Sequence, residues 1–163
     1  MKKVKKVEIV VCIKKQTLSV WLNGEQFREY PVSTSKYGVG NKAGSYKTPL
    51  GLHRVCEKIG KDEPIGTIFK GKKSTGNVLG DDAELFQGQH LITSRIIRLE
   101  GLEEGINKGQ GIDSTKRYIW IHGTSDEGMI GKPASHGCIR LKNEHVLEFF
   151  DLVKVGTEVN IVR

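Results

Sequence analysis

The chain has few residues of several informative kinds. Aromatic side chains make up only 7% of the 163 residues, which disfavours a surface that stacks single-stranded nucleic acid. No apolar run approaches the roughly 18 residues that suggest a transmembrane helix. Cysteine occurs three times, at Cys12, Cys56 and Cys138, too rarely for a disulfide scaffold. The odd count leaves at least one free thiol, and a bridge between Cys12 and Cys56 stays open.

Positive charge and glycine are in surplus. Lys and Arg number 26 against 19 Asp and Glu, so the net charge is +7. An anionic partner is therefore expected, whether a nucleic acid, an anionic membrane face or a carboxylate-rich polymer. The 20 glycines show no three-residue period, which excludes collagen and favours many turns between short segments. The length and the uniform composition predict one domain over residues 1–163.

The first residues resemble the basic start of a signal peptide, because Lys occupies positions 2, 3, 5 and 6. The segment that follows, 7–13, contains Glu8 and runs into two more lysines without a small-residue cleavage site. No signal peptide is recognised. We therefore expect a chain that either stays in the cytoplasm or has lost a leader.

The hydrophobic pattern predicts a mostly β domain. Residues 7–13 and 18–22 alternate with a period of two, and Asn23-Gly24 then indicates a hairpin that returns over 26–32. Further strands are expected at 52–59, 65–69, 90–99, 118–121 and 157–162. One helix is expected, with Asn143 as its cap and an apolar stripe over Val146, Phe149, Phe150 and Val153. The prediction is an antiparallel β-sandwich or open barrel with one main α-helix packed on it, and a long surface loop at 101–114.

The residues that suggest chemistry lie between positions 121 and 141. His122 ends an apolar strand, and Ser-His-Gly-Cys-Ile-Arg follows at 135–140. A cysteine thiol attacks as the thiolate but is mostly protonated at neutral pH, so a nearby imidazole has to take its proton. His122 and His136 both qualify. Gly137 allows close backbone approach to Cys138, as an oxyanion pocket needs, and Arg140 suits a substrate carboxylate.

This segment resembles the signature of the L,D-transpeptidase catalytic domain, the YkuD-type family: a His-Gly pair, a spacer, then Ser-His-Gly-Cys with Arg two positions on. Thr48-Pro49-Leu50-Gly51 resembles a second stretch of that family. The resemblance implies that Cys138 is the nucleophile and that His122, oriented by the carbonyl of Gly123, is the proton donor and acceptor. It assigns His136 and Gly137 to the pocket and oxyanion site, with Ser135 supporting them. It also implies that Arg140, Gly123 and Thr124 bind the substrate.

The implied reaction is acyl transfer on peptidoglycan stem peptides. Cys138 would attack the carbonyl between the L-centre of a diamino acid and a terminal D-Ala, release D-Ala, and pass the acyl group to another stem in a 3→3 crosslink. Capture by water would instead give a carboxypeptidase. Carbapenems are expected to acylate the cysteine, and no metal or organic cofactor is implied. The family analogy also implies a place in the cell envelope or periplasm.

Several other interpretations stay open at this point. A zinc site could draw on His122, His136 and Cys138 with His53 or Cys56, although compact paired spacing is missing. A nucleic-acid-binding module would use the positive charge but lacks a recognised motif, so no nucleic-acid partner is expected. A non-catalytic wall-binding module is the third alternative. His53, His90 and His145 stand alone in the sequence and are expected to be solvated or structural.

Overall fold

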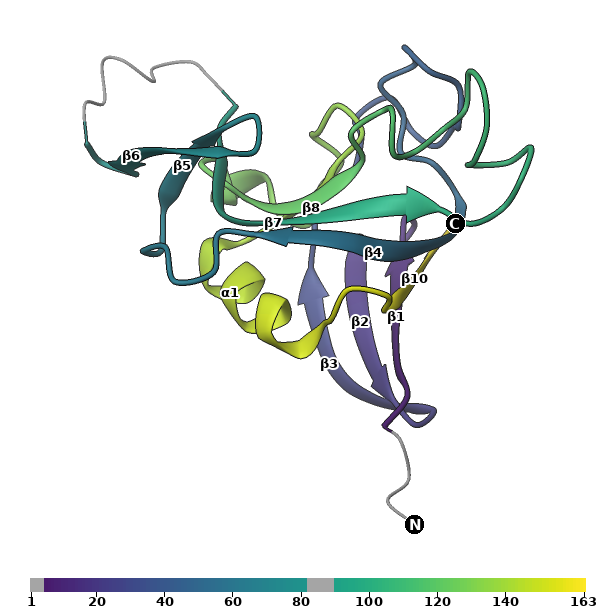
Figure 1. Ribbon diagram of the computed structural model, residues 1–163, viewed down its shortest axis with the longest axis horizontal. Coiled ribbons are helices and arrows are strands. Elements are labelled where there is room, and N and C mark those ends of the chain that lie inside the picture. Colours follow the sequence, from purple (N-terminus) through teal and green to yellow (C-terminus); the bar gives the residue numbers. More distant parts are fainter. Residues whose placement is uncertain (1–4, 82–89) are drawn as a thin grey trace.

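The strands pair into one sheet that bends around an α-helix (Figure 1). The computed structural model describes residues 5–81 and 90–163. Its strands are β1 Val7–Cys12, β2 Thr17–Leu22, β3 Glu25–Pro31, β4 Gly51–Ile59, β5 Thr67–Lys70, β6 Lys73–Val78, β7 Ile92–Gly101, β8 Trp120–Thr124, β9 Ile139–Leu141 and β10 Glu158–Val162. The helices are the short η1, Glu127–Met129, and α1, Asn143–Leu152.

The sheet mixes parallel and antiparallel pairs. Its main order is β3-β2-β1-β10-β4-β7-β5-β6, and β8 joins β7 to β9. The expected mostly β fold with one main helix is confirmed. However, β1 pairs with β10 and β8 pairs with β9 in parallel, so antiparallel pairing holds only for the other pairs. β1 and β10 lie at opposite ends of the chain, and a crossover segment that contains η1 separates β8 from β9. Local residue patterns do not show whether such strands pair in parallel.

The first hairpin forms where Asn-Gly predicts it. Asn23 and Gly24 have φ of 49° and 84°, the left-handed values that a type I′ turn requires. The strand at 73–78 was not predicted. Its residues are exposed or half-buried and show no alternation of apolar and polar side chains, so it forms by pairing with β5. The segment 101–114 is the expected loop, apart from Gly101, which ends β7.

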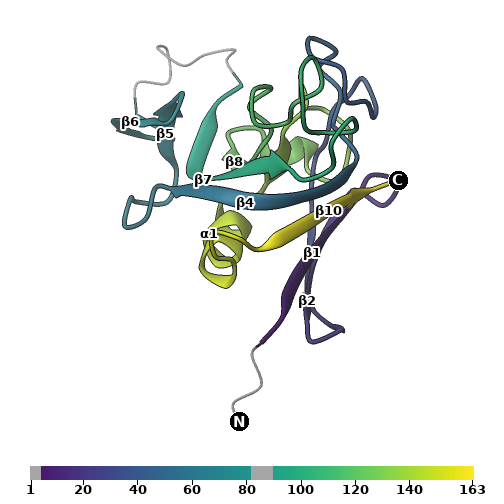
Figure 2. The same ribbon diagram turned by 45° about the vertical axis from the view of Figure 1, so that its right-hand side comes forward.

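The core lies between the bent sheet and α1, which sits in the angle of the sheet in both ribbon views (Figure 2). Val146, Phe149 and Phe150 are buried as the apolar stripe predicts, and they pack against Ile9, Val11, Leu18, Ile97, Leu99, Ile121 and Ile139 among others. The predicted cap is wrong. Asn143 is the first helical residue, Lys142 precedes it without a side-chain cap, and Glu127 accepts the Asn143 backbone N–H.

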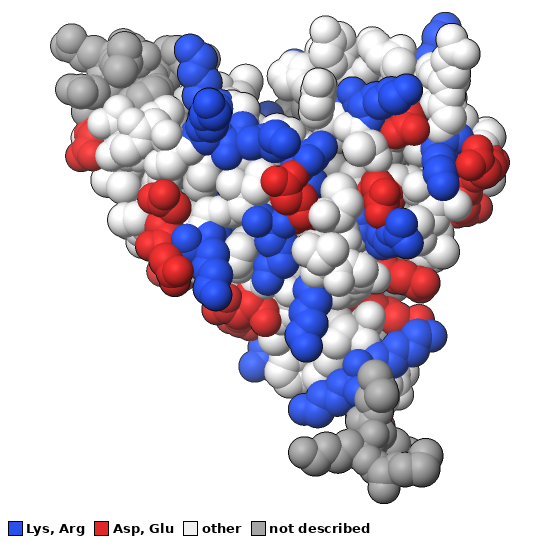
Figure 3. All heavy atoms as spheres, in the orientation of Figure 1, with Lys and Arg blue, Asp and Glu red and all other residues white. Residues whose placement is uncertain are grey.

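Charges of both signs are interspersed on the surface. On the face shown in Figure 3, Lys and Arg lie among Asp and Glu, and no region of one sign dominates it. Six ion pairs are formed among the described residues, and most lie on exposed or half-exposed side chains. Within residues 5–81 and 90–163, no helix is long and apolar enough to cross a membrane.

Candidate active site

Strands β8 and β9 place the predicted catalytic residues next to one another. They pair in parallel with His122 opposite Arg140 and Ile121 opposite Ile139. Ile121 and Ile139 are fully buried in the core. Because alternate residues of a strand point to opposite faces, His122 and Arg140 lie on the face away from that core. Cys138 lies in the bend directly before β9.

The thiol of Cys138 is held by backbone groups. It donates to the carbonyl oxygen of Tyr118 at 3.3 Å and accepts from the N–H of Trp120 at 3.5 Å. Burial raises the pKa of the Cys138 thiol, while the Trp120 N–H and the charges of Arg140 and Arg117 pull this pKa back down. Burial is the largest of these effects, so the resting thiol is neutral at pH 7.

His122 is buried, with 4% of its surface exposed, and its orientation is fixed. Its Nδ1 lies 2.6 Å from the carbonyl oxygen of Gly123. A carbonyl only accepts hydrogen bonds, so Nδ1 carries the proton and Nε2 is left as the basic nitrogen. Burial lowers the pKa of His122 to about 4. The imidazole is therefore a neutral base at pH 7, and the resting pair is a neutral thiol and a neutral imidazole.

Gly123 and Thr124, predicted to bind substrate, lie in the interior and support His122. A Cβ on Gly123 would come within 2.5 Å of the Thr93 carbonyl oxygen, so only glycine fits there. Thr124 is 1% exposed, and its carbonyl accepts from Asn143 Nδ2 at 2.9 Å. Their burial favours a structural part for both residues.

Asn143 is a supporting residue whose part the sequence did not reveal. Its Oδ1 accepts from Thr93 Oγ1 and from Ser94 Oγ, each at 2.6 Å. Together with the bond to Thr124, this side chain joins the start of α1 to β7 and β8. Asparagine before an apolar helical stripe is typical of a helix cap, so the sequence pattern predicted a cap and did not indicate this network.

The turn before Cys138 is braced from two sides. Ser135 Oγ donates to the Cys138 carbonyl oxygen at 2.6 Å and accepts from the Gly137 N–H at 3.2 Å. Thr48 Oγ1 donates to the Gly137 carbonyl oxygen at 3.0 Å. Gly137 has φ of 128°, which glycine adopts readily. The Thr-Pro-x-Gly stretch therefore supports the cysteine loop. The Gly137 N–H, which was predicted for the oxyanion site, donates to Ser135 Oγ in this structure.

Arg140 is a cation buried beside the thiol. It is 7% exposed, and its charge acts on Cys138. Among the described residues, no ion pair within 4 Å includes its guanidinium. Buried charges are normally paired. An anionic ligand would supply the missing partner.

His136 is exposed and lies among other rings. Its ring centroid is 5.9 Å from those of Tyr37 and Tyr46 and 5.8 Å from that of His90. No hydrogen bond joins it to Cys138 among the described residues. His122 therefore differs from His136 in being buried with a fixed tautomer, whereas His136 lies exposed among other rings. The expectation that His90 stands alone is wrong, because the fold brings its ring to His136.

The other histidines and cysteines have structural surroundings. His53 is fully buried between the Gly51 carbonyl and Ser114 Oγ, and the ring of His145 packs against Tyr30. All three cysteines are free, so Cys12 and Cys56 are not bridged. In the part of the chain that the structure describes, no three His, Cys, Asp or Glu side chains are grouped as metal ligands. The zinc alternative therefore has no ligand set there.

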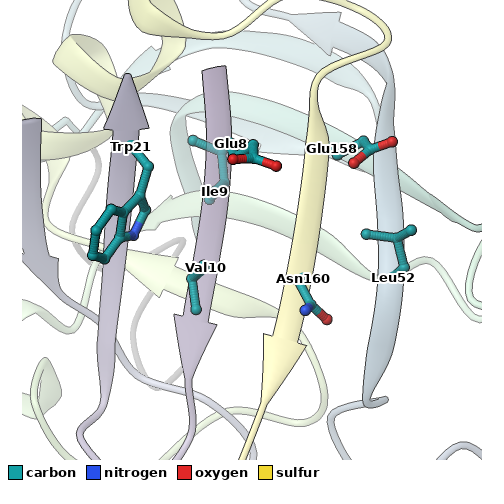
Figure 4. A pocket seen from close by; sticks show the side chains of 7 residues that line it. All are labelled: Glu8, Ile9, Val10, Trp21, Leu52, Glu158 and Asn160. Carbon is teal, nitrogen blue, oxygen red and sulfur yellow. The ribbon is translucent and has the colours of Figure 1, made fainter. Parts of the chain in front are cut away.

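A separate groove lies on the outer face of the sheet, away from the thiol. Figure 4 shows Trp21, Glu8, Glu158 and Asn160 on strands β2, β1 and β10, with Leu52 on β4. Glu8 and Glu158 are register partners, and Lys6 forms an ion pair with Glu8 at 2.9 Å. None of the predicted catalytic residues lines this groove.

Comparison with known proteins gives a consistent family. Residues 6–161 match the model of the YkuD L,D-transpeptidase catalytic domain. A putative L,D-transpeptidase, YkuD of Bacillus licheniformis, is 47% identical over 47 residues, which are 29% of this chain and 28% of that protein. The chain thus matches less than a third of the length of this curated relative.

Solved structures share the fold at low sequence identity. The L,D-transpeptidase LdtMt1 in complex with imipenem superposes with a TM-score of 0.61 and 22% identity, over 97% of this chain and 59% of that one. L,D-transpeptidase 3 from Mycobacterium tuberculosis, in complex with a faropenem-derived adduct, superposes with a TM-score of 0.61 and 18% identity. The match covers 98% of this chain and 61% of that one. With the family model matched over residues 6–161, the chain belongs to the L,D-transpeptidase catalytic domain family.

Proposed function

We propose that this protein is a cysteine-dependent L,D-transpeptidase that acts on peptidoglycan stem peptides. The observation that carries the proposal is the arrangement at the paired strands β8 and β9, where His122 lies opposite Arg140 and the Cys138 thiol accepts from the N–H of Trp120 at the start of β8. A nucleophile, a base of fixed tautomer and a buried cation are the groups that acyl transfer from a carboxylate-bearing peptide requires.

Acylation begins with proton transfer from Cys138 to Nε2 of His122. The thiolate forms a bond to the carbonyl carbon between the diamino acid and the terminal D-Ala of the donor stem. As the tetrahedral intermediate collapses, the amide C–N bond breaks and the imidazolium returns the proton to the leaving amine of D-Ala. The product is a thioester on Cys138. Burial lowers the pKa of His122, which makes the imidazolium a strong acid for this step.

Deacylation repeats the proton transfers in the opposite order. The amine of an acceptor stem loses a proton to His122 and attacks the thioester, and the thiol of Cys138 is restored. The result is a 3→3 crosslink, whereas water in place of the amine gives hydrolysis. Arg140 is the residue we assign to the carboxylate of the terminal D-Ala, because it is buried beside the thiol. Since the substrate is a wall polymer, we place the activity in the cell envelope.

The first test is covalent labelling by a carbapenem. LdtMt1 has been solved with imipenem, and L,D-transpeptidase 3 from Mycobacterium tuberculosis with a faropenem-derived adduct. We expect imipenem to add once to this protein, and intact-mass spectrometry should show a single adduct that peptide mapping places on Cys138.

Cys138→Ala is the essential variant in this experiment. Cys12→Ala is its matched control, because Cys12 is a free cysteine on β1, which pairs with β2 and β10 and not with β8 or β9. Cys138→Ala should gain no adduct, while Cys12→Ala should react like the wild type. An unmodified wild type, or equal labelling of the two variants, would falsify the proposal that Cys138 is the nucleophile.

A further inference from the structure

A pocket lined by two basic residues lies beside the loop that carries Cys138. It has a volume of about 190 Å³ and is lined by Tyr46, Lys116, Arg117, Ile119 and His136, with the small residues Ala43 and Gly44. A Cβ on Gly137 would lie 3.4 Å from Ile119 Cδ1, so one wall of the pocket packs directly on the cysteine loop. The Tyr118 carbonyl, which accepts the Cys138 thiol, belongs to the same short segment as Lys116 and Arg117.

Arg117 is held at this pocket by backbone oxygens. Its guanidinium donates to the Gly40 carbonyl at 3.2 Å and to the Lys47 carbonyl at 2.6 Å, and it also donates to Ser45 Oγ at 3.3 Å. These bonds fix the loop around 40–47 against residue 117. All three acceptors are neutral, so the half-buried positive charge is not compensated by them. Its charge reaches the thiol, because Arg117 lowers the pKa of Cys138.

Among the described residues, no carboxylate lies in ion-pair contact with the cations of this pocket. The ion pairs among the described residues include neither Lys116 nor Arg117. Asp113 is the neighbouring carboxylate. Its oxygens accept from the backbone N–H groups of Gly109, Thr115 and Lys116, and its charge also acts on Lys116 from beyond ion-pair distance. The pocket is therefore lined by two cations, a tyrosine and a histidine, together with the apolar residues Ala43 and Ile119. This set suits a carboxylate attached to an aliphatic chain.

We propose that this pocket binds the side-chain carboxylate of the diamino acid in a stem peptide, and so makes the enzyme selective for stems that carry this carboxylate free. The inference rests on the proposed function and extends it. Arg140, on β9, is assigned to the carboxylate of the terminal D-Ala, so the pocket at Lys116 and Arg117 recognises a second anionic group. This second carboxylate belongs either to the donor stem or to the acceptor stem.

The test uses three synthetic stem tetrapeptides that differ only in the side chain of the third residue: a free carboxylate, its carboxamide, and a plain lysine. Binding is measured by calorimetry to Cys138→Ala, which cannot turn them over. We expect the carboxylate peptide to bind about tenfold more tightly than the carboxamide, the effect of one charge-assisted contact. Adding Lys116→Gln should bring this ratio close to one.

Lys70→Gln in the same background is the matched control. Lys70 is exposed on β5, which lies across the molecule from the green loop that carries Lys116 (Figure 1). The control should keep the tenfold ratio. Equal affinity of Cys138→Ala for the carboxylate and carboxamide peptides overturns the inference, and so does a preference that survives both Lys116→Gln and Arg117→Lys.

Turnover by the native enzyme distinguishes the two sources of the carboxylate. A lower KM for the carboxylate peptide in D-Ala release without an acceptor assigns the pocket to the donor stem. A preference that arises only when the acceptor is varied assigns it to the acceptor. Failure to release D-Ala from any peptide, together with no imipenem adduct, counts against the proposed function. Calorimetry on Cys138→Ala measures selective binding without turnover, so it tests the pocket separately from the proposed function.

Discussion

At the scale of single residues, burial sets the chemistry of the site. The thiol of Cys138 and the imidazole of His122 are both pushed toward their neutral forms. A resting thiolate–imidazolium pair, which the sequence alone allows, is therefore disfavoured. The charge forms during attack, when the substrate has displaced water and the positive charges of Arg117 and Arg140 stabilise the thiolate.

Replacing each histidine in turn distinguishes the catalytic part of His122 from that of His136, the second histidine of the motif. We expect His122→Gln to lower kcat/KM for D-Ala release by about 10²–10⁴-fold, the usual contribution of a general base. His136→Gln is the matched control and should lose much less, because the His136 ring packs among tyrosines and His90. Steady-state kinetics with one stem peptide compares the two. A greater loss in His136→Gln would reverse the assignment of the base.

At the scale of elements, the site depends on how α1 meets β7 and β8. The pairing of β7 with β8 shifts register between Thr93 and Ile96, and Ser94 in this irregularity has φ of 67°. The shift lets the hydroxyls of Thr93 and Ser94 both reach Asn143 Oδ1. Strand β8 ends in this network, one residue beyond Gly123. The network therefore fixes the carbonyl that orients His122.

Removing the Asn143 side chain should destabilise the protein. Asn143→Ala leaves two buried hydroxyls and the Thr124 carbonyl without this partner. We expect the free energy of unfolding to fall by about 1–3 kcal/mol, the usual cost of unsatisfied buried polar groups. Urea denaturation followed by circular dichroism measures it. Glu144→Ala, at the next and exposed position, should change stability by less than about 0.5 kcal/mol. Similar losses in both variants would show that the network is not important.

At the scale of the whole molecule, two histidines are buried on different strands, His53 on β4 and His122 on β8. Burial lowers the pKa of His53 and of His122 to about 4 each. In the unfolded chain both return to about 6.5. Between pH 4 and 6.5 the unfolded state thus binds more protons than the folded state. This contribution to stability is complete above pH 6.5 and is lost as the pH falls toward 4.

Acidification from pH 7 to 5 should therefore lower the free energy of unfolding by roughly 1–2 kcal/mol for each buried histidine. Urea denaturation at several pH values measures the slope of the free energy of unfolding against pH. His53→Gln removes one titrating group and should reduce the slope in this range. His90→Gln, at an exposed position, should keep it. A wild-type stability that is constant between pH 7 and 5 would contradict the burial of neutral histidines.

Much of this protein is determined by local patterns in its sequence. Alternation of apolar residues and the Asn-Gly pair were sufficient for the first hairpin, and a stripe at helical spacing was sufficient for α1. The Ser-His-Gly-Cys-Ile-Arg segment identified the family and the residues proposed for catalysis. These features depend on contacts between near neighbours in the chain, or on a motif whose chemistry is visible in its residue types.

Only the tertiary structure decided how these pieces act together. The parallel pairing of β8 with β9 sets His122 opposite Arg140, and burial then gives the thiol and imidazole their neutral states. Asn143 became a support for the catalytic strand, and Lys116 and Arg117 came to line a pocket beside Cys138. Each outcome depends on residues distant in sequence, and on how much water the fold excludes from between them. Neither can be read from local sequence.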